Sequence, residues 1–192
     1  MVGYVATWLR GSLALLAALT GVIALVLAVD TTRFTALQPA AILATVNFSA
    51  LDDQTYTATV VTANGDRFER TLSGDVSQLQ LELLAWDSPW RRLSLAPRAR
   101  VLAISSRYLQ FSRAEESRRA DFAAEQTLVL DRWSILDRME NWLSSIGIQR
   151  RLQPATTMPL ADQASYRIIQ LSGKFAAQPA NLSAEVAMQS YR

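Results

Sequence analysis

The chain has 192 residues, of which 50% are hydrophobic, and a formal net charge of +2. It contains neither cysteine nor histidine, which excludes disulfide bonds, thiolate nucleophiles, Cys- or His-ligated metal sites and the Ser-His-Asp arrangement of hydrolases. The charge excess is small and no nucleic-acid reading motif is recognisable, so no nucleic-acid partner is expected. We therefore expect a non-enzymatic protein without a cofactor or a metal.

The first predicted element is the apolar stretch Ser12–Val29, which carries no charge and no proline. At a rise of ~1.5 Å per residue, this length is about the minimum that crosses the ~30 Å hydrocarbon core of a bilayer. The stretch is longer than the apolar core of a cleavable signal peptide, which is the alternative. The sequence therefore predicts one uncleaved transmembrane helix.

Small residues recur in this stretch at steps of three and four, which places them along one side of a helix. Helices in lipid associate where small residues let the backbones approach closely. The stripe therefore predicts a docking face for another transmembrane helix; the alternative is that alanine is simply abundant in this chain. The predicted docking residues are Ala14, Ala17, Ala18, Gly21, Ala24 and Ala28.

The flanks of the apolar stretch suggest a membrane interface. Tyr4 and Trp8 are suited to the headgroup layer, and Arg10 lies at the mouth of the span. Positive charges on the two sides are nearly balanced, so orientation is weakly determined. We expect a single-pass protein of a bacterial inner membrane with its domain in the periplasm, the cytoplasmic side being the alternative. The expected partners are the lipid bilayer and the transmembrane helices of a larger membrane complex.

The rest of the chain reads as one domain of strands. We expect a tail and helix over 1–30, a linker over 31–40 and a mostly-β domain over 41–192. Apolar and polar residues alternate over 44–49, 55–60 and 78–84, which predicts strands, and residues 101–108 offer another strand. The sequence Asn64-Gly65-Asp66 predicts a hairpin turn between the second strand and residues 68–72.

The C-terminal half adds helices and further strands. Residues 113–126 are charged and are expected to form a helix or an arm. Asp131 is a good amino-terminal cap for a helix that ends near residue 146 and covers the sheet with its apolar face. Strands are expected over 158–160 and 166–171, and a short helix over 181–192. The predicted fold class is α+β: one N-terminal transmembrane helix and a mainly antiparallel, sandwich- or barrel-like sheet domain with a covering helix.

Positive charge gathers in the middle of the chain, where residues 87–113 carry a net charge of +5. Such a block suits anionic headgroups or an acidic partner. The alternative is a solvated or internally paired face. The possible basic contact surface comprises Arg91, Arg92, Arg98 and Arg100.

One pair of residues raises the question of catalysis. Lys174 is the only lysine, and Ser172 stands two residues before it. The pair does not follow the S-x-x-K spacing of serine-lysine hydrolases, and no oxyanion loop is evident. The adjacent acids Asp52 and Asp53 lack the pattern of a metal-binding loop. A serine-lysine hydrolase is therefore less favoured than the two non-catalytic functions considered below, an accessory subunit and a binding module.

Five stretches of the chain carry a resemblance to a known group of proteins. They are Gly74-Asp75, Leu83-Leu84-Ala85-Trp86 to Pro89-Trp90, Ser106-Arg107-Tyr108, Thr157-Met158-Pro159-Leu160-Ala161-Asp162 to Tyr166, and Gln178-Pro179-Ala180-Asn181. In these stretches and in the order of its features, the chain resembles small single-span inner-membrane proteins of Gammaproteobacteria that are often labelled "cation/multidrug efflux pump". The resemblance implies a membrane anchor and a small domain but no catalytic residue, and a lone helix cannot form an alternating-access pathway.

These observations favour a non-catalytic accessory or assembly subunit of a larger inner-membrane complex, whether respiratory, photosynthetic or concerned with transport. The alternative is a tethered binding or adaptor module, for example one associated with efflux. An apolar pocket with converging polar groups in the sheet domain would favour this second function.

Overall fold

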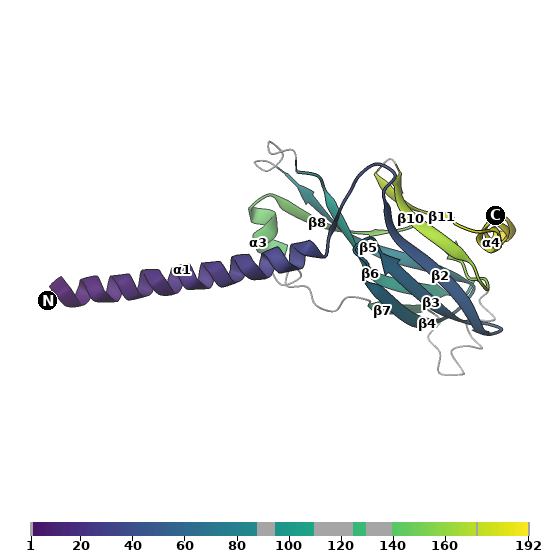
Figure 1. The fold of residues 1–192 in the computed structure, drawn as a ribbon, viewed down its shortest axis with the longest axis horizontal. Helices are drawn as coiled ribbons and strands as arrows, with labels where there is room; N and C mark the ends of the chain where they lie inside the picture. The colour runs from purple at the N-terminus through teal and green to yellow at the C-terminus, as the bar shows by residue number, and fades with distance from the viewer. Residues whose placement is uncertain (1, 88–94, 110–124, 130–139, 172, 192) are drawn as a thin grey trace.

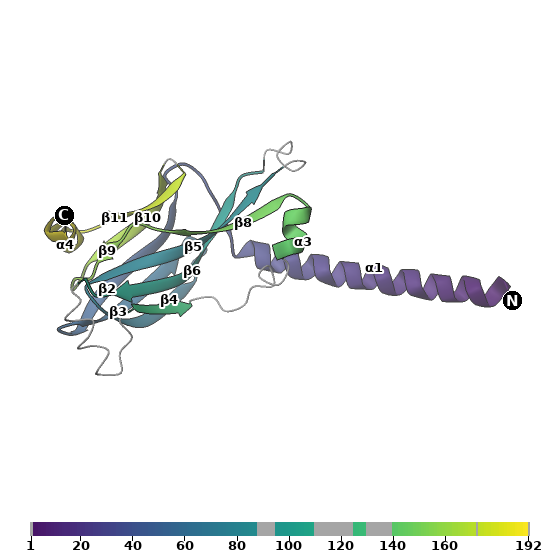
Figure 2. The same cartoon turned by 180° about the vertical axis from the view of Figure 1, so that it is seen from behind.

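A long N-terminal helix, α1 (Val2–Thr32), leads into a domain of two antiparallel sheets (Figure 1). The computed structural model describes residues 2–87, 95–109, 125–129, 140–171 and 173–191. Within these residues, two short helices accompany the sheets, α3 (Glu140–Ser145) and α4 (Leu182–Tyr191). α4 lies at the opposite end of the β domain from α1 (Figures 1 and 2).

Each sheet combines strands from both halves of the chain. Among the described residues, the first sheet has the order β1-β6-β5-β8, with β7 paired to β6 and β9 to β5. The second has the order β11-β10-β2-β3-β4. The strands of the first sheet are β1 (Thr35–Ala36), β5 (Val76–Trp86), β6 (Arg98–Arg107), β7 (Glu125–Val129), β8 (Ile148–Pro154) and β9 (Met158–Pro159). Those of the second are β2 (Ile42–Asp52), β3 (Thr55–Thr62), β4 (Arg67–Ser73), β10 (Ser165–Leu171) and β11 (Lys174–Pro179).

Turn residues explain why the strands fold back where they do. Gly65 has φ +89° in the β3–β4 turn, where the amide of Thr62 donates to the carbonyl of Asp66 over 2.9 Å. This confirms the predicted hairpin. Between β4 and β5, Gly74 has φ +145°, and a Cβ there would lie 2.8 Å from the carbonyl oxygen of Arg107. Only glycine fits this position, where the chain passes from one sheet to the other.

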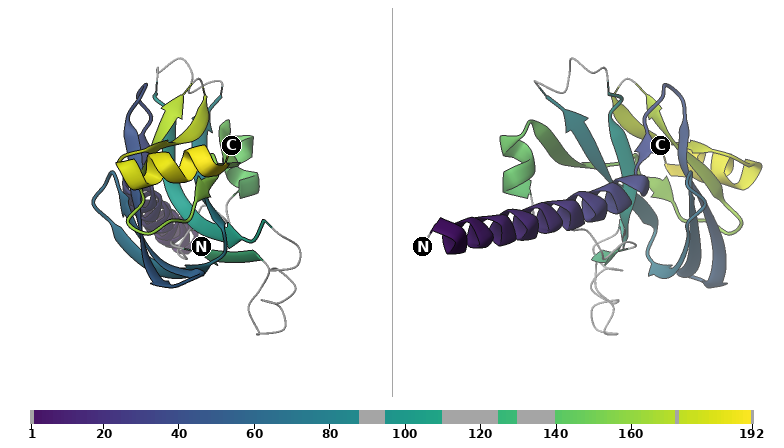
Figure 3. Two further views of the ribbon diagram at one scale, coloured as in Figure 1. Left: turned by 90° about the vertical axis from the view of Figure 1, so that its right-hand side faces the viewer. Right: turned by 60° about the vertical axis from the view of Figure 1, so that its left-hand side comes forward.

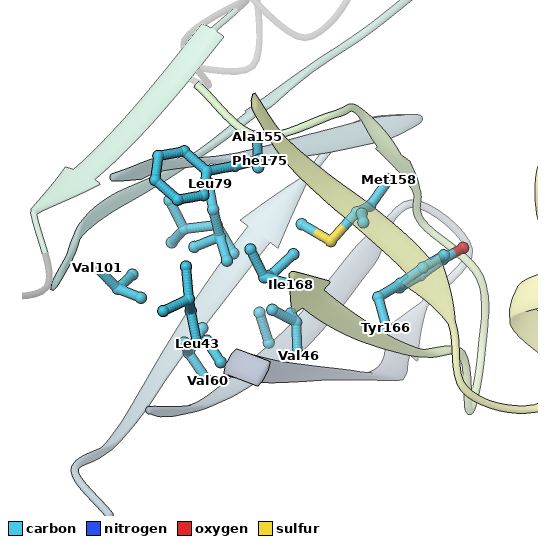
Figure 4. Close-up of a cluster of buried hydrophobic side chains, with 14 of the residues drawn as sticks. Leu43, Val46, Val60, Leu79, Val101, Ala155, Met158, Tyr166, Ile168 and Phe175 are labelled. Carbon is cyan, nitrogen blue, oxygen red and sulfur yellow. The ribbon is translucent and has the colours of Figure 1, made fainter. Parts of the chain in front are cut away.

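The core lies between the two sheets and is built by alternating side chains (Figure 4). Val46 and Phe48 of β2 are buried, as the sequence alternation predicted, and meet Leu79 and Leu81 of β5. The strands expected near 101–108 and 166–171 are likewise present as β6 and β10. Tyr166 is fully buried, packs edge-on against Phe48, and its hydroxyl donates to the carbonyl of Pro159 over 2.9 Å.

The membrane prediction requires correction. Across the described part of the chain, no helix has both the length and the apolar character needed to span a bilayer. The predicted transmembrane helix is therefore wrong, and so are the α+β fold class that contained it, the single-pass character and the placement in a bacterial inner membrane. A hydropathy window measures composition alone and stops short of Asp30, whereas α1 continues to Thr32 and its last turn is built into the β domain through Asp30 and Arg100. The structure supports a mostly antiparallel β protein.

The predicted covering helix also differs. Only α3 lies in the described part of the stretch 131–146, since residues 131–139 lie outside it. Leu143 of α3 packs on Phe34 and Leu84 in a small second core rather than across the sheet. The charged stretch 113–126 lies mostly outside the described residues, and its last two positions begin β7.

Candidate functional site

α1 leaves the β domain at one end and extends alone for most of its length (Figures 1 and 3). Its large apolar side chains are between 59% and 75% exposed. A helix with apolar residues on several sides is normally buried, because the apolar surface is unfavourable in water. α1 is therefore the most prominent candidate contact surface of the molecule. The exposed residues are Trp8, Leu13, Leu15, Leu16, Leu19, Val22 and Leu25.

The predicted docking residues all lie on this one helix and are exposed. At about 100° per residue, the six positions from Ala14 to Ala28 occupy an arc of about 120°. Leu15, Leu16 and Leu19 lie on the opposite side, and Leu25 falls within the arc. α1 thus has a side of mostly small residues, interrupted only by Leu25 between Ala14 and Ala28, and a bulky side. We call the first side the small-residue stripe (Ala14, Ala17, Ala18, Gly21, Ala24 and Ala28).

The predicted interface residues lie near the free end of this helix. Trp8 and Arg10 are exposed, and Tyr4 belongs to the first turns of α1. The hydroxyl of Ser12 donates to the carbonyl of Trp8 over 3.0 Å, which satisfies this polar group within the helix.

At its other end, α1 is joined to the β domain by buried charges. The Asp30 carboxylate lies 3.3 Å from Nη1 of Arg100, whose Nε donates to Glu82 over 2.6 Å. The second carboxylate oxygen of Glu82 accepts from Nε of Arg150. The side chains of Asp30, Glu82 and Arg100 are at most 7% exposed. These four residues, which we call the junction cluster, connect α1 to β5, β6 and β8.

Apolar and polar contacts complete the junction. The Arg100 guanidinium lies 4.7 Å from the ring centre of Phe34, a cation–π distance. The side-chain amide of Asn64, in the β3–β4 turn, donates to the carbonyl of Arg33 over 2.8 Å, and the hydroxyl of Thr35 donates to Asn64 Oδ1 over 3.1 Å. The residues that follow α1 are thus held by both sheets, which fixes the direction in which the helix leaves the domain.

The predicted basic contact surface is only partly described. Arg100 faces the interior and belongs to the junction cluster, and Arg98 of β6 is half-buried. Arg91 and Arg92 lie outside the described residues. The structure therefore brings Arg98 and Arg100 together on one strand but places Arg100 among acidic partners.

Sequence reasoning missed the role of Glu82 and Arg150. Period-two alternation placed Glu82 on the polar face of β5, opposite Leu81. In the structure this face is also covered, because Leu84 on the same side packs with Phe34 and Leu143. The signal that could have found the cluster is the pair of acids Asp30 and Glu82 against an excess of arginine, but nothing in the sequence says which arginine meets them.

The serine-lysine pair does not form a described site. Lys174 is exposed at the start of β11, and Ser172 lies outside the described residues. Within the parts of the chain that the structure covers, no group of acidic side chains is arranged to hold a metal ion. Asp53 contributes to a raised pKa of Tyr56, of which burial is the main cause and Asp162 and Asp75 the next largest.

A groove of about 550 Å³ lies beside Lys174. The end of β8 and the two residues that follow it line one side, and the end of β10 with the start of β11 lines the other. Its lining residues are Gln153, Pro154, Ala155, Thr156, Leu171, Lys174, Phe175 and Ala176.

Comparison with known proteins returns no matching family model, no matching curated protein and no matching solved structure. The resemblance to the small gammaproteobacterial proteins therefore stays a prediction.

Proposed function

We propose that the protein is a non-catalytic accessory subunit of a larger protein assembly, which it joins through α1. The observation that carries the proposal is the row of exposed apolar side chains along α1, from Trp8 to Leu25. Exposed apolar surface of this extent marks an interaction site. The occupant we propose is a group of apolar helices contributed by partner proteins.

The two sides of α1 indicate that the partner contributes several helices rather than one. The small-residue stripe suits one closely approaching helix, because a small residue lets two backbones come near. A single helix on the stripe leaves the bulky side, with Leu15, Leu16 and Leu19, in contact with water. Complete burial of α1 therefore requires a multi-helix partner.

The junction supports a role in positioning the β domain. A helix held only by a flexible linker would let the domain swing, whereas Asp30 and Phe34 fix the end of α1 to β5 and β6. Docking of α1 then sets the position of the whole domain within the assembly.

The test replaces Gly21, in the stripe, by isoleucine. A Cβ at Gly21 meets nothing within 4 Å, so Gly21→Ile leaves the isolated chain undisturbed while it blocks close approach of a partner helix. Ser12→Ile is the matched control, because Ser12 lies on the opposite side of α1 and receives the same β-branched side chain. After gentle native extraction, Gly21→Ile is expected to lose co-purifying proteins that Ser12→Ile retains. Equal retention by both variants would contradict docking through the stripe.

A further inference from the structure

The groove beside Lys174 is a second contact surface, separate from α1. It lies where the end of β8 and the start of β11 come together, on the side of the core marked by Ala155 and Phe175 (Figure 4). Its volume, about 550 Å³, falls within the range of small-molecule sites, ~300–1,000 Å³. The groove is therefore large enough for a ligand of modest size.

The floor of the groove is fixed by main-chain contacts. Ala155 and Phe175 are 2% and 3% exposed and form a parallel bridge between the two sheets. The amide of Thr156 donates to the carbonyl of Phe175 over 3.1 Å, and the Thr156 hydroxyl reaches the same oxygen over 3.3 Å. Because these atoms belong to the sheet framework, the floor is formed before any ligand arrives, which lowers the entropic cost of binding.

The walls are apolar and open to solvent. Leu171 is 45% exposed although its side chain lines the groove, and Pro154 and Ala176 add further apolar surface. These side chains offer an alkyl chain a surface from which water is displaced favourably. The lining therefore favours an apolar group over a polar one.

The charge of Lys174 favours a ligand with an anionic head. Lys174 is the one cation among the described lining residues, and no acid stands among them. An ammonium group attracts an anionic head, whereas a cationic head would be repelled at the same place. The lysine stem can also lie along the apolar wall while its charge stays in water.

From this combination we propose that the groove binds an anionic amphiphile, with its alkyl chain along Leu171 and Pro154 and its head at Lys174. A carboxylate and a phosphate head share this chemistry. The site is independent of α1, so the proposal stands or fails separately from the accessory-subunit function.

The test measures binding of decanoate, decyl phosphate, decanol and decyltrimethylammonium to the full chain by titration calorimetry. Either anionic ligand is expected to bind with one-to-one stoichiometry, and the tighter of the two identifies the head. Lys174→Met is expected to weaken anion binding about tenfold and decanol binding less than twofold. Arg167→Met is the matched control, because Arg167 is an exposed cation of the neighbouring β10 that does not line the groove.

The variant Leu171→Glu distinguishes binding in the groove from binding to α1, because α1 also offers apolar surface to alkyl chains. Leu171 is partly exposed, so the substitution leaves the fold intact, which a thermal unfolding curve verifies. The variant is expected to weaken binding of the anionic ligands and decanol alike. The proposal is overturned if Lys174→Met and Arg167→Met bind decanoate equally, if Leu171→Glu binds all ligands as the unmodified chain does, or if neither anion binds.

Discussion

Four charged side chains meet where α1 joins the β domain, and at the scale of single residues they are the most unusual feature of the molecule. Glu82 is fully buried, and its two carboxylate oxygens accept from different arginines, Arg100 and Arg150. Buried ion pairs add little net stability over apolar residues, but removal of one partner leaves an uncompensated charge. The junction cluster therefore fixes one arrangement of α1 and makes each member costly to remove.

We predict that Arg100→Ala lowers the free energy of unfolding by ~3–5 kcal/mol, because Glu82 and Asp30 lose a buried partner. Chemical denaturation followed by circular dichroism measures this change. Arg67→Ala is the control, since Arg67 pairs with Glu69 over 2.5 Å at the surface with both side chains more than half exposed. That exposed pair is expected to contribute less than ~1 kcal/mol. Equal losses in both variants would contradict a special role for the cluster.

A second residue-scale prediction concerns pH. Burial raises the pKa of Tyr166 to about 12 from its usual 10.0. The folded chain therefore holds this proton more tightly than the unfolded chain, so the contribution to stability is complete below pH 10 and is lost as the pH rises toward 12. We expect Tyr166→Phe to flatten the fall in unfolding free energy over this interval.

The same substitution at neutral pH removes the hydrogen bond to Pro159, at a cost of about 1 kcal/mol. Tyr191→Phe is the control, because Tyr191 is 41% exposed at the end of α4. If the unfolding free energy of Tyr166→Phe falls as steeply above pH 10 as that of the unmodified chain, the buried tyrosine is not the group that titrates.

At the scale of elements, the turn between β4 and β5 decides how the two sheets connect. Gly74 packs closely against the main chain of Arg107, and the amide of Asp75 donates to the Arg107 carbonyl over 3.1 Å. Ser106 strengthens the contact by donating from its hydroxyl to the carbonyl of Ser73 over 2.9 Å. The corner is therefore held by β6, which is distant in the sequence.

We predict that Gly74→Ala lowers the free energy of unfolding by about 3 kcal/mol, because it combines an unfavourable φ with a clash against the Arg107 carbonyl. Gly65→Ala is the matched control, with φ +89° but open space around the added Cβ. It is expected to cost about 1 kcal/mol. Denaturation midpoints measure both changes, and similar losses would show that crowding at Gly74 is unimportant.

The elements also show what the sequence could and could not predict. The β3–β4 hairpin and the alternation in β2 depend on neighbouring residues, which a local pattern captures. The Asp30–Arg100 contact joins residues 70 positions apart, and the second core around Phe34 covers a face of β5 that alternation assigned to solvent. Hydropathy located the helix but could not show that its last turn belongs to the β domain.

For the molecule as a whole, we expect α1 to bind the partner and the β domain to fold without most of α1. The β domain has its own core between two sheets, and Asp30 is the residue of α1 that reaches the junction cluster. A chain shortened to residues 30–192 therefore retains the cluster and the core but lacks the exposed apolar surface.

We predict that this shortened chain folds, with a cooperative unfolding transition, and does not retain the partner proteins that co-purify with the full chain. Denaturation of the purified shortened chain measures the first property, and the native mass of both forms after gentle extraction measures the second. A shortened chain that aggregates or lacks cooperative unfolding would show that α1 is needed to complete the β domain, rather than to reach a partner.

The most direct test of an accessory role is the native mass of the full chain extracted gently from its own cells. We predict an assembly well above the 21.3 kDa of the single chain, which contains different proteins in fixed proportion and dissociates in the variant Gly21→Ile. A particle of 21.3 kDa, an assembly of this chain alone, or recovery with lipid but no protein partner would contradict it.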